Sequence, residues 1–232
     1  MKVEIWSDVV CPWCYVGKRR FEKALAAFPH RESVELVWRS FELDSTTPPS
    51  PAEGGVYAER LARKYGRTLE QAQEMLDSMT ATAATEGLDF RFDLARPGNT
   101  FDAHRLLHLA LAHGVQDELK ERLDRGTFTE GLAVSDHASL RELAVEVGLP
   151  AAEVDDVLSS DRFADDVRRD QAQARAYGIT GVPFFVIDEA IGVSGAQPAE
   201  LLGQALQQAW EQRGPLTVLA GGEVCEDDAC AV

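Results

Sequence analysis

The first forty residues alternate between strand-like and helix-like patterns of hydrophobic positions. Positions 2–10 are rich in apolar and β-favouring residues (Val3, Ile5, Trp6, Val9 and Val10), which predicts a buried strand. Apolar residues then recur at helical spacing to about Phe28, with Pro12 in the first turn, where a missing backbone N–H is tolerated. Partial alternation over positions 34–43 predicts a second strand. This part of the chain therefore predicts strand, helix and strand in that order.

The middle of the chain, from Val56 to about Leu158, is almost entirely helical in its pattern. A loop rich in proline and serine at positions 45–51 separates it from the second predicted strand. Glycines such as Gly66 and Gly87 stand where helices commonly end. The predicted helices cover residues 57–65, 69–86, 100–113, 115–129 and 137–147.

The last third of the chain returns to a mixed pattern. A helix is predicted over residues 162–177, a β-run over 178–187, a short strand over 190–193 and a closing helix over 198–212. The order of elements predicts an α/β layer with a large all-α subdomain inserted into it.

The predicted division into domains follows from this order. Residues 1–50 and 160–213 are expected to form the discontinuous α/β domain, with 51–159 as the inserted helical subdomain. Residues 214–232 read as a flexible, glycine-rich and acidic tail.

Composition narrows the class of protein. With 232 residues, 45% of them hydrophobic and 27% charged, the chain can build a core and remain in solution. It holds no apolar run long enough to span a bilayer, so no membrane partner is expected. A net charge of −16 argues against nucleic acid as a partner. Glu4 and Asp8 interrupt any secretory signal, which predicts a cytoplasmic protein.

Four cysteines form two close pairs, and the first pair carries the clearest chemistry. The stretch Cys11-Pro12-Trp13-Cys14 lies directly between a predicted strand and a predicted helix. Residues three apart at a helix start can form a disulfide. The helix dipole favours a thiolate there, so Cys11 is the expected nucleophile and Cys14 the resolving thiol. Half of a zinc site and two unrelated buried cysteines are the alternatives. No metal is predicted.

A second unusual feature is Pro183, which enters a predicted strand after Gly181-Val182. Proline removes a donor from the hydrogen-bond ladder, so it is rare at such a position. A cis Val182–Pro183 bond in a tight turn would explain it, although only about 5–6% of X–Pro bonds in folded proteins are cis. The residues themselves leave both isomers open.

Taken together, these motifs resemble the DsbA family of thioredoxin-fold proteins, over residues 1–213. Cys-Pro-Trp-Cys after an N-terminal strand, a long helical insertion and a late Gly-Val-Pro-Phe-Phe carry the resemblance. Four finer stretches are similar to the FrnE subgroup of that family. They are Trp6-Ser7-Asp8, residues 99–105 (NTFDAHR), residues 180–185 (TGVPFF) and residues 193–197 (VSGAQ).

The resemblance implies a site around the dithiol. Val182–Pro183 would be cis and would pack beside Cys11, with the Val182 backbone pairing with an incoming peptide strand. The insertion would cover the groove. The other residues expected to contact the substrate are Pro12, Trp13, Asn99 and His104.

The second cysteine pair, Cys225 and Cys230, lies in the acidic tail. A similar Cys-x4-Cys pair is found in some FrnE-type proteins, which makes an auxiliary redox shuttle one interpretation. A four-thiolate metal site shared with the first pair and a non-essential tail are the others. His104 and His108 have a ligand-like spacing, but a packed or solvated helix face is the expected role of that pair.

The sequence thus predicts a cytoplasmic thiol–disulfide oxidoreductase that acts on disulfide-containing proteins or peptides. Reductase, oxidase and isomerase all fit, and the sequence does not specify an oligomeric state. No bound cofactor is expected, although an external thiol reductant such as thioredoxin or glutathione is compatible with the chemistry. One alternative is a glutathione-dependent isomerase or transferase similar to 2-hydroxychromene-2-carboxylate isomerases and kappa-class glutathione transferases, which usually carry serine at the position of Cys11. Another is a chaperone or metal-binding module.

Overall fold

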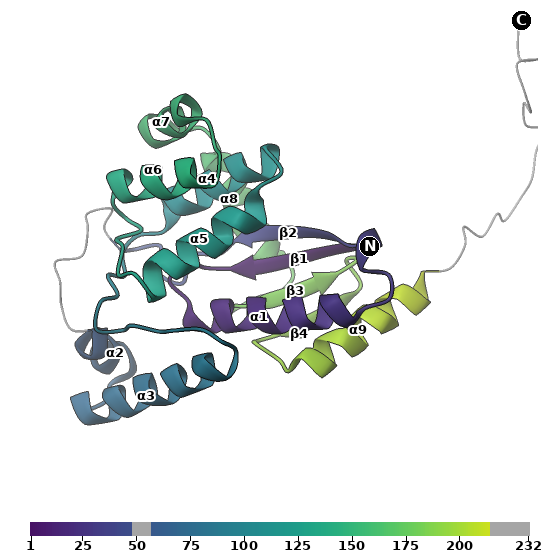
Figure 1. Cartoon of the computed structure of the whole chain (residues 1–232), viewed down its shortest axis with the longest axis horizontal. Helices are drawn as coiled ribbons and strands as arrows, with labels where there is room; N and C mark the ends of the chain where they lie inside the picture. The colour runs from purple at the N-terminus through teal and green to yellow at the C-terminus, as the bar shows by residue number, and fades with distance from the viewer. Residues whose placement is uncertain (48–56, 214–232) are drawn as a thin grey trace, which may run out of the picture.

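The computed structural model describes residues 1–47 and 57–213 (Figure 1). The described strands are β1 (Lys2–Ser7), β2 (Glu35–Ser40), β3 (Phe184–Ile187) and β4 (Ile191–Ser194). The described α-helices are α1 (Pro12–Ala27), α2 (Tyr57–Tyr65), α3 (Leu69–Thr85), α4 (Phe101–Ala112), α5 (Gln116–Phe128), α6 (His137–Glu146), α7 (Ala151–Ser159), α8 (Ala164–Ala176) and α9 (Ala199–Gln212). Over these ranges, none of the helices is both long and apolar enough to cross a bilayer.

The strands form one mixed sheet in the order β2-β1-β3-β4. β1 is central: it pairs in parallel with β2 and antiparallel with β3. In this register Trp6 lies opposite Phe184, so the residues just before Phe184 lie beyond the carboxyl end of β1. The chain leaves β1 toward α1 at that same end.

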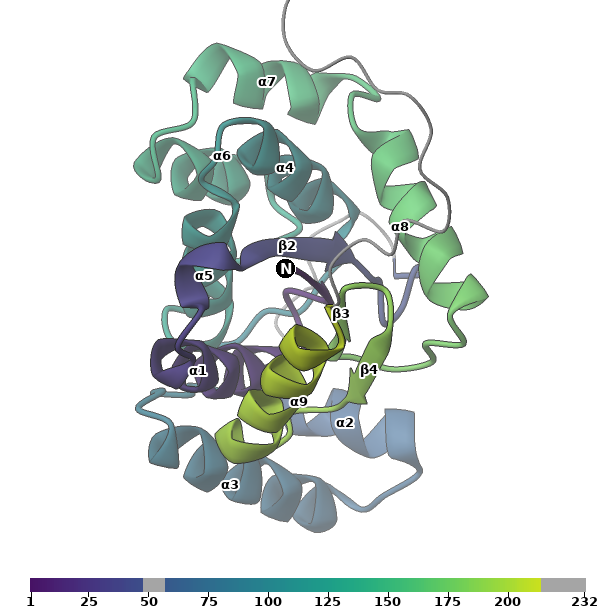
Figure 2. The same cartoon turned by 90° about the vertical axis from the view of Figure 1, so that its right-hand side faces the viewer.

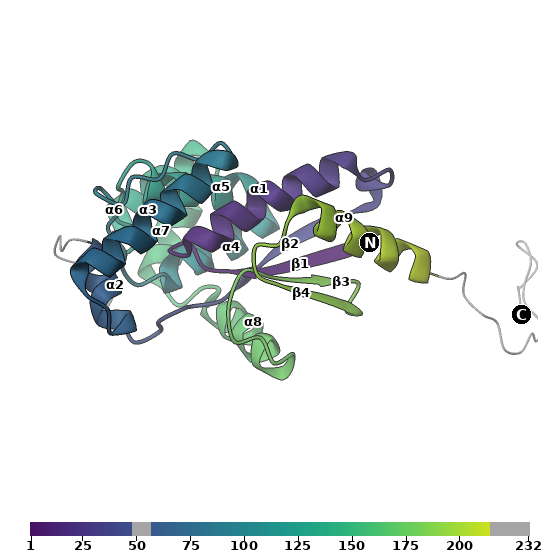
Figure 3. The ribbon, with the colours of Figure 1, turned by 90° about the horizontal axis from the view of Figure 1, so that it is seen from below.

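Each face of the sheet is covered by helices, and the alternation along β1 decides which side chains meet which helices. Val3 and Ile5 belong to a core with residues of α1 and α9, such as Phe21 and Leu206. Trp6 points to the opposite face and packs with residues from α8 and the loop after it. Figure 3 shows α1 and α9 on one side of the sheet and α8 on the other.

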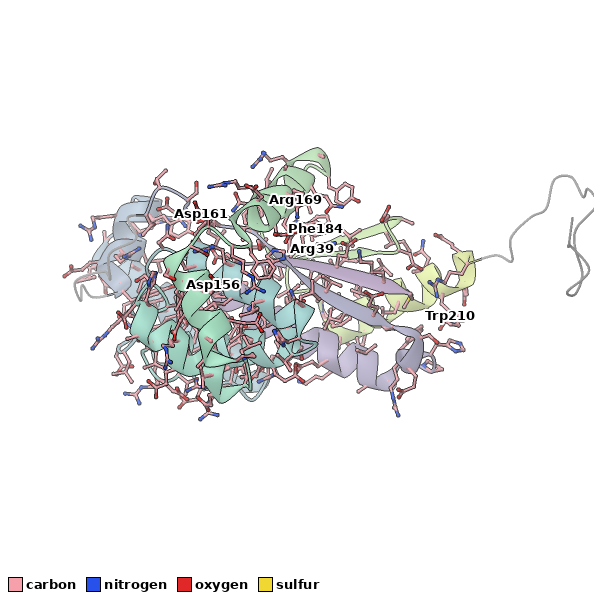
Figure 4. All side chains as sticks on the ribbon, turned by 90° about the horizontal axis from the view of Figure 1, so that it is seen from above. Arg39, Asp156, Asp161, Arg169, Phe184 and Trp210 are labelled. Atoms are coloured by element: carbon pink, nitrogen blue, oxygen red, sulfur yellow. The ribbon has the colours of Figure 1, made fainter. Side chains whose placement is uncertain are left out.

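The face toward α8 also holds a buried ionic network. The Arg39 guanidinium lies 2.8 Å from the Glu4 carboxylate through Nε and 3.0 Å from Asp170 Oδ1 through Nη1. Figure 4 labels Arg39 and Phe184 near α8. Buried charges need such partners, because an unpaired ion away from water is strongly destabilising.

Helices α2–α7 all lie between β2 and β3 in the sequence, and they pack in two groups. α4–α7 gather beyond β2 around a leucine-rich core (Figure 2). α2 and α3 lie near the end of the sheet where α1 begins (Figure 1). An aromatic cluster of Tyr15, Phe90, Phe92 and Phe128 joins α1 to this second group.

The predicted α/β fold with helices inserted between its strands is confirmed. Each predicted helix is present, with its ends within two residues of the expected positions. The strand predictions for positions 2–10 and 34–43 were too long. Residues 8–10 turn into α1 instead, and Leu43 leaves the sheet to donate its N–H to the Asp8 side chain. α7 was not predicted as a separate helix.

A buried lysine and aspartate lie one turn apart on α5. The side chains of Lys120 and Asp124 are fully buried and form an ion pair. Lys120 Nζ also lies 5.2 Å from the centre of the Trp38 ring on β2. Burial raises the pKa of the Asp124 carboxyl to about 6 despite the opposing effect of Lys120. The pair therefore constrains how α5 packs against β2.

We expect Lys120→Met to lower the free energy of unfolding by about 3–5 kcal/mol near pH 8, because it leaves the Asp124 carboxylate buried without a partner. The difference in unfolding free energy between the variant and the wild-type protein should be smaller at pH 5. The folded state binds the Asp124 proton more tightly than the unfolded state does, so the variant loses stability as the pH rises from 5 to 8 and this proton is released. Urea unfolding at the two pH values measures this. The double variant Lys120→Met/Asp124→Leu should recover most of the loss, and a double variant as unstable as the single one would contradict the interpretation.

Candidate active site

The dithiol lies at the junction of β1 and α1. Cys11 is the residue that precedes the first turn of α1, in an extended conformation, and Pro12 is the first helical residue. The Cys11 N–H donates to the Asp8 carbonyl at 3.2 Å, and the Cys14 N–H donates to the Cys11 carbonyl at 3.0 Å. This turn holds the Cys11 side chain at the helix N-terminus, where the helix dipole favours a negative charge.

The two thiols have different environments. Both are free and both are buried, but Cys11 keeps 4% of its surface exposed and lines a cleft, whereas Cys14 does not line it. Cys14 is completely buried. Burial, with smaller contributions from the neighbouring Cys11, raises the pKa of the Cys14 thiol well above its usual range. Cys14 is therefore protonated at neutral pH and has no direct contact with solvent, which suits a thiol that acts only after Cys11.

The Val182–Pro183 segment lies beside Cys11. Its peptide bond is cis, the isomer that the resemblance to the DsbA family implies. The Cys11 thiol donates a hydrogen bond to the Val182 carbonyl oxygen at 3.6 Å. On the other side, the Pro183 carbonyl accepts from the Gly195 N–H at 2.8 Å, which ties the segment to the end of β4.

Gly17 is a position that the sequence reasoning missed. It lies inside α1, and a Cβ built on it would come within 2.8 Å of Pro183 Cγ. Such a distance is shorter than a van der Waals contact, and the proline ring has little freedom to move away. Only glycine at this position lets α1 approach Pro183 so closely. The sequence does contain a signal for this position, which is a glycine inside a segment with a strongly helical pattern.

A cleft of about 1430 Å³ opens at the dithiol. Of the predicted site residues, Cys11, Pro12, Trp13 and Val182 line it. Its other walls come from the loop after β2, from α2 and from α3. Trp13 exposes 46% of its surface there, which gives the cleft an apolar rim next to the nucleophile.

Two of the residues expected to contact the substrate, Asn99 and His104, do not line this cleft. The Asn99 side chain donates to the Thr47 carbonyl and accepts from the Phe101 N–H, so it organises the start of α4. His104 is buried behind the cleft, where its Nε2 lies 3.4 Å from Asp8 Oδ1 without hydrogen-bond alignment. His108, one turn along, contacts Ser40 and Asp170.

Asp8 and Tyr57 are further cleft residues that the sequence reasoning did not identify. Asp8 is almost fully buried, and its Oδ2 accepts the Leu43 N–H at 2.8 Å. Tyr57 lines the same cleft as Cys11, and burial raises the pKa of its phenol. Among the described residues, no group of three or more His, Cys, Asp or Glu could hold a metal ion. Cys225 and Cys230 lie outside the described residues.

Comparisons with known proteins agree with this architecture. A model described as the DSBA-like thioredoxin domain matches residues 2–207. A crystal structure of a probable DsbA oxidoreductase from Streptomyces coelicolor is 52% identical, with a TM-score of 0.92 over 100% of this chain and 99% of that one.

Two other relatives are more distant. A Bacillus subtilis protein, the uncharacterized YwbO, is 29% identical over 91% of this chain and 98% of its own length. The cytosolic disulfide reductase DsbM from Pseudomonas aeruginosa shares the fold, with a TM-score of 0.59 and 16% identity over 91% of this chain and 96% of that one.

The contact between Gly17 and Pro183 gives a prediction with an internal control. Gly203 lies within α9, and a Cβ at Gly203 would meet no atom within 4 Å. Gly203→Ala should therefore raise the free energy of unfolding by up to about 1 kcal/mol, as expected for a helix interior. Gly17→Ala should not raise the free energy of unfolding in this way. It should also lower thiol–disulfide exchange activity, because α1 and Pro183 must move apart. Equal stability gains with full activity in both variants would show that the contact does not matter.

Proposed function

This chain belongs to the DSBA-like thioredoxin domain family, and we propose that it catalyses thiol–disulfide exchange with Cys11 as nucleophile and Cys14 as resolving thiol. The observation that supports this most directly is the asymmetry of the two thiols. Cys11 lies at a helix N-terminus on the wall of the cleft, whereas Cys14 is buried and holds its proton. This asymmetry supports Cys11 as the thiol that attacks first.

The exchange has two steps. The Cys11 thiolate attacks one sulfur of a substrate disulfide, a bond forms between them, and the other substrate sulfur leaves with the electron pair. Cys14 then loses its proton and attacks Cys11, which releases the second substrate thiolate and leaves a Cys11–Cys14 disulfide. An external thiol reductant such as thioredoxin or glutathione restores the dithiol. Run in reverse, the same steps oxidise a substrate.

We propose a protein or peptide as the substrate. The Val182 backbone borders the cleft next to Cys11, where an extended chain could pair with it in the manner of an added strand. The cleft is larger than the range of about 300–1000 Å³ that is usual for small-molecule sites. We also propose a cytoplasmic location, like that of the cytosolic disulfide reductase DsbM, whose fold is similar.

The central test is the reduction of insulin by dithiothreitol. We expect the wild-type protein to accelerate the reaction and Cys11→Ser to reduce the rate to the uncatalysed background. The Cys14→Ser variant should still attack the substrate disulfide through Cys11. It should then accumulate a mixed disulfide that mass spectrometry detects, because the resolving thiol is missing.

Failure of the wild-type protein with all its thiols free would contradict the proposal. The same outcome would make glutathione-dependent isomerisation of an aromatic substrate the next reaction to assay. A measurement of the reduction potential of the Cys11–Cys14 pair would separate a reductase from an oxidase.

We also propose that Cys225 and Cys230 pass electrons to or from the Cys11–Cys14 pair. They lie close to the C-terminus, and Glu226, Asp227 and Asp228 between them carry negative charge. These charges disfavour a thiolate, so the tail pair is a poor first nucleophile and a better relay. A tethered pair of this kind would act at an effective concentration in the millimolar range.

The double variant Cys225→Ser/Cys230→Ser should slow steady-state turnover, most clearly when the external thiol is below about 1 mM. The single-turnover reaction of Cys11 with a disulfide should stay unchanged, because the first attack does not involve the tail. Steady-state turnover equal to that of the wild-type protein at low thiol concentration would exclude the relay.

A further inference from the structure

Most of the basic side chains of this protein lie beside a carboxylate. The chain has 23 lysines and arginines, and all of them lie in the described residues. All but six lie within 4.0 Å of a carboxylate oxygen in that part of the chain. The six exceptions are Arg60, Arg63, Lys64, Arg67, Arg96 and Arg175.

Four of these six line the cleft at Cys11. Arg60, Arg63 and Lys64 lie on α2, and Arg67 follows directly after it. Arg60 is half-buried and donates to the Pro97 carbonyl at 3.3 Å, whereas the other three are exposed. In the following we call these four residues the basic wall.

Four basic residues in one cleft without a carboxylate partner among the described residues are unusual for a protein with a net charge of −16. Arg63 and Lys64 lie in the last turn of α2, where the helix dipole favours positive charge, but Arg60 and Lys64 are one turn apart and repel each other. A cleft lined by one sign of charge raises the local concentration of ligands of the opposite sign. Because the basic wall lines the same cleft as Cys11, the substrate is the ligand it would meet.

The acidic residues of the cleft do not cancel the basic wall. Asp8 is nearly fully buried and lies against His104. Asp44 is exposed; hydrogen bonds from Thr46, with a smaller contribution from the charge of Lys64, lower the pKa of its carboxyl, so it stays ionised and offsets part of the basic wall. Glu74 is the remaining acidic residue in the lining. The cations therefore outnumber the carboxylates that a ligand would meet.

We propose that the cleft selects disulfide-bearing peptide segments with aspartate or glutamate next to the reacting cysteine. The basic wall binds the carboxylates while the reacting sulfur meets Cys11, and the exposed faces of Trp13 and Met75 contact apolar parts of the segment. The inference rests on the proposed thiol–disulfide exchange and adds the class of substrate to it.

The test uses the full chain and three peptide disulfides of one length, whose cysteines are flanked by Glu, Gln or Lys. We expect kcat/KM to be about ten-fold higher for the Glu peptide than for the Lys peptide at low ionic strength. The preference should nearly vanish in about 1 M salt, where the screening length falls to about 3 Å. The Gln peptide should lie between the two.

A matched pair of variants locates the effect. Arg63 and Arg175 are both exposed and unpaired among the described residues, but only Arg63 lines the cleft. Arg63→Glu, or Lys64→Glu as a second variant, should remove most of the preference for the Glu peptide. Arg175→Glu changes the net charge equally and should retain the preference.

The outcomes separate the two proposals. Equal kcat/KM for all three peptides, with turnover that still requires Cys11, would overturn the substrate class and leave the exchange reaction intact. A preference that Arg175→Glu reduces as much as Arg63→Glu would also overturn it, because the effect would then come from net charge alone. No Cys11-dependent turnover of any peptide would overturn the exchange reaction itself.

Discussion

The antiparallel pairing of β1 with β3 is the constraint on which the candidate site depends. Because Trp6 lies opposite Phe184, the end of β1 and the start of β3 meet at one point of the sheet. The chain enters α1 through Cys11 on one side of that point and enters β3 through Pro183 on the other. Residues more than 170 positions apart in the sequence are thereby brought into contact, as the hydrogen bond from Cys11 to Val182 shows. A shift of this register by one residue would reverse the faces of β3 and separate the two segments.

The inserted helices supply what the sheet alone lacks, which is a wall opposite the nucleophile. Tyr15, one residue after the dithiol, packs with Phe90 and Phe128 and so couples the first turn of α1 to the inserted helices. The loop after β2 and helices α2 and α3 then enclose the cleft. Helix α1 therefore has three roles. Cys11 directly precedes it, its Gly17 packs closely against Pro183, and its Tyr15 and Val16 pack with residues of α2 and α3.

Local patterns were sufficient for most of the fold. Helical periodicity, together with glycines just past the helix ends, predicted the positions of the helices because both signals lie within a few residues in sequence. The dithiol was recognisable for the same reason. Three other features depend on residues that are distant in sequence. They are the contact between Gly17 and Pro183, the burial of His104 against Asp8, and the absence of a carboxylate near Arg63 among the described residues. The end of β2 also involves a distant contact, because the Leu43 N–H beyond the strand donates to the Asp8 side chain rather than to a neighbouring strand.

The burial of Cys14 has a consequence for oxidative damage. Peroxide can enter the cleft that Cys11 lines but cannot reach the completely buried Cys14, so oxidation of the dithiol would begin at Cys11 and produce a sulfenic acid there. Cys14, protected from the oxidant itself, is already in place to displace water from that sulfenic acid and form the Cys11–Cys14 disulfide. The enclosed thiol thus gives the protein a way to stop before the irreversible sulfinic and sulfonic acids, and any reductant that restores the dithiol also repairs the damage.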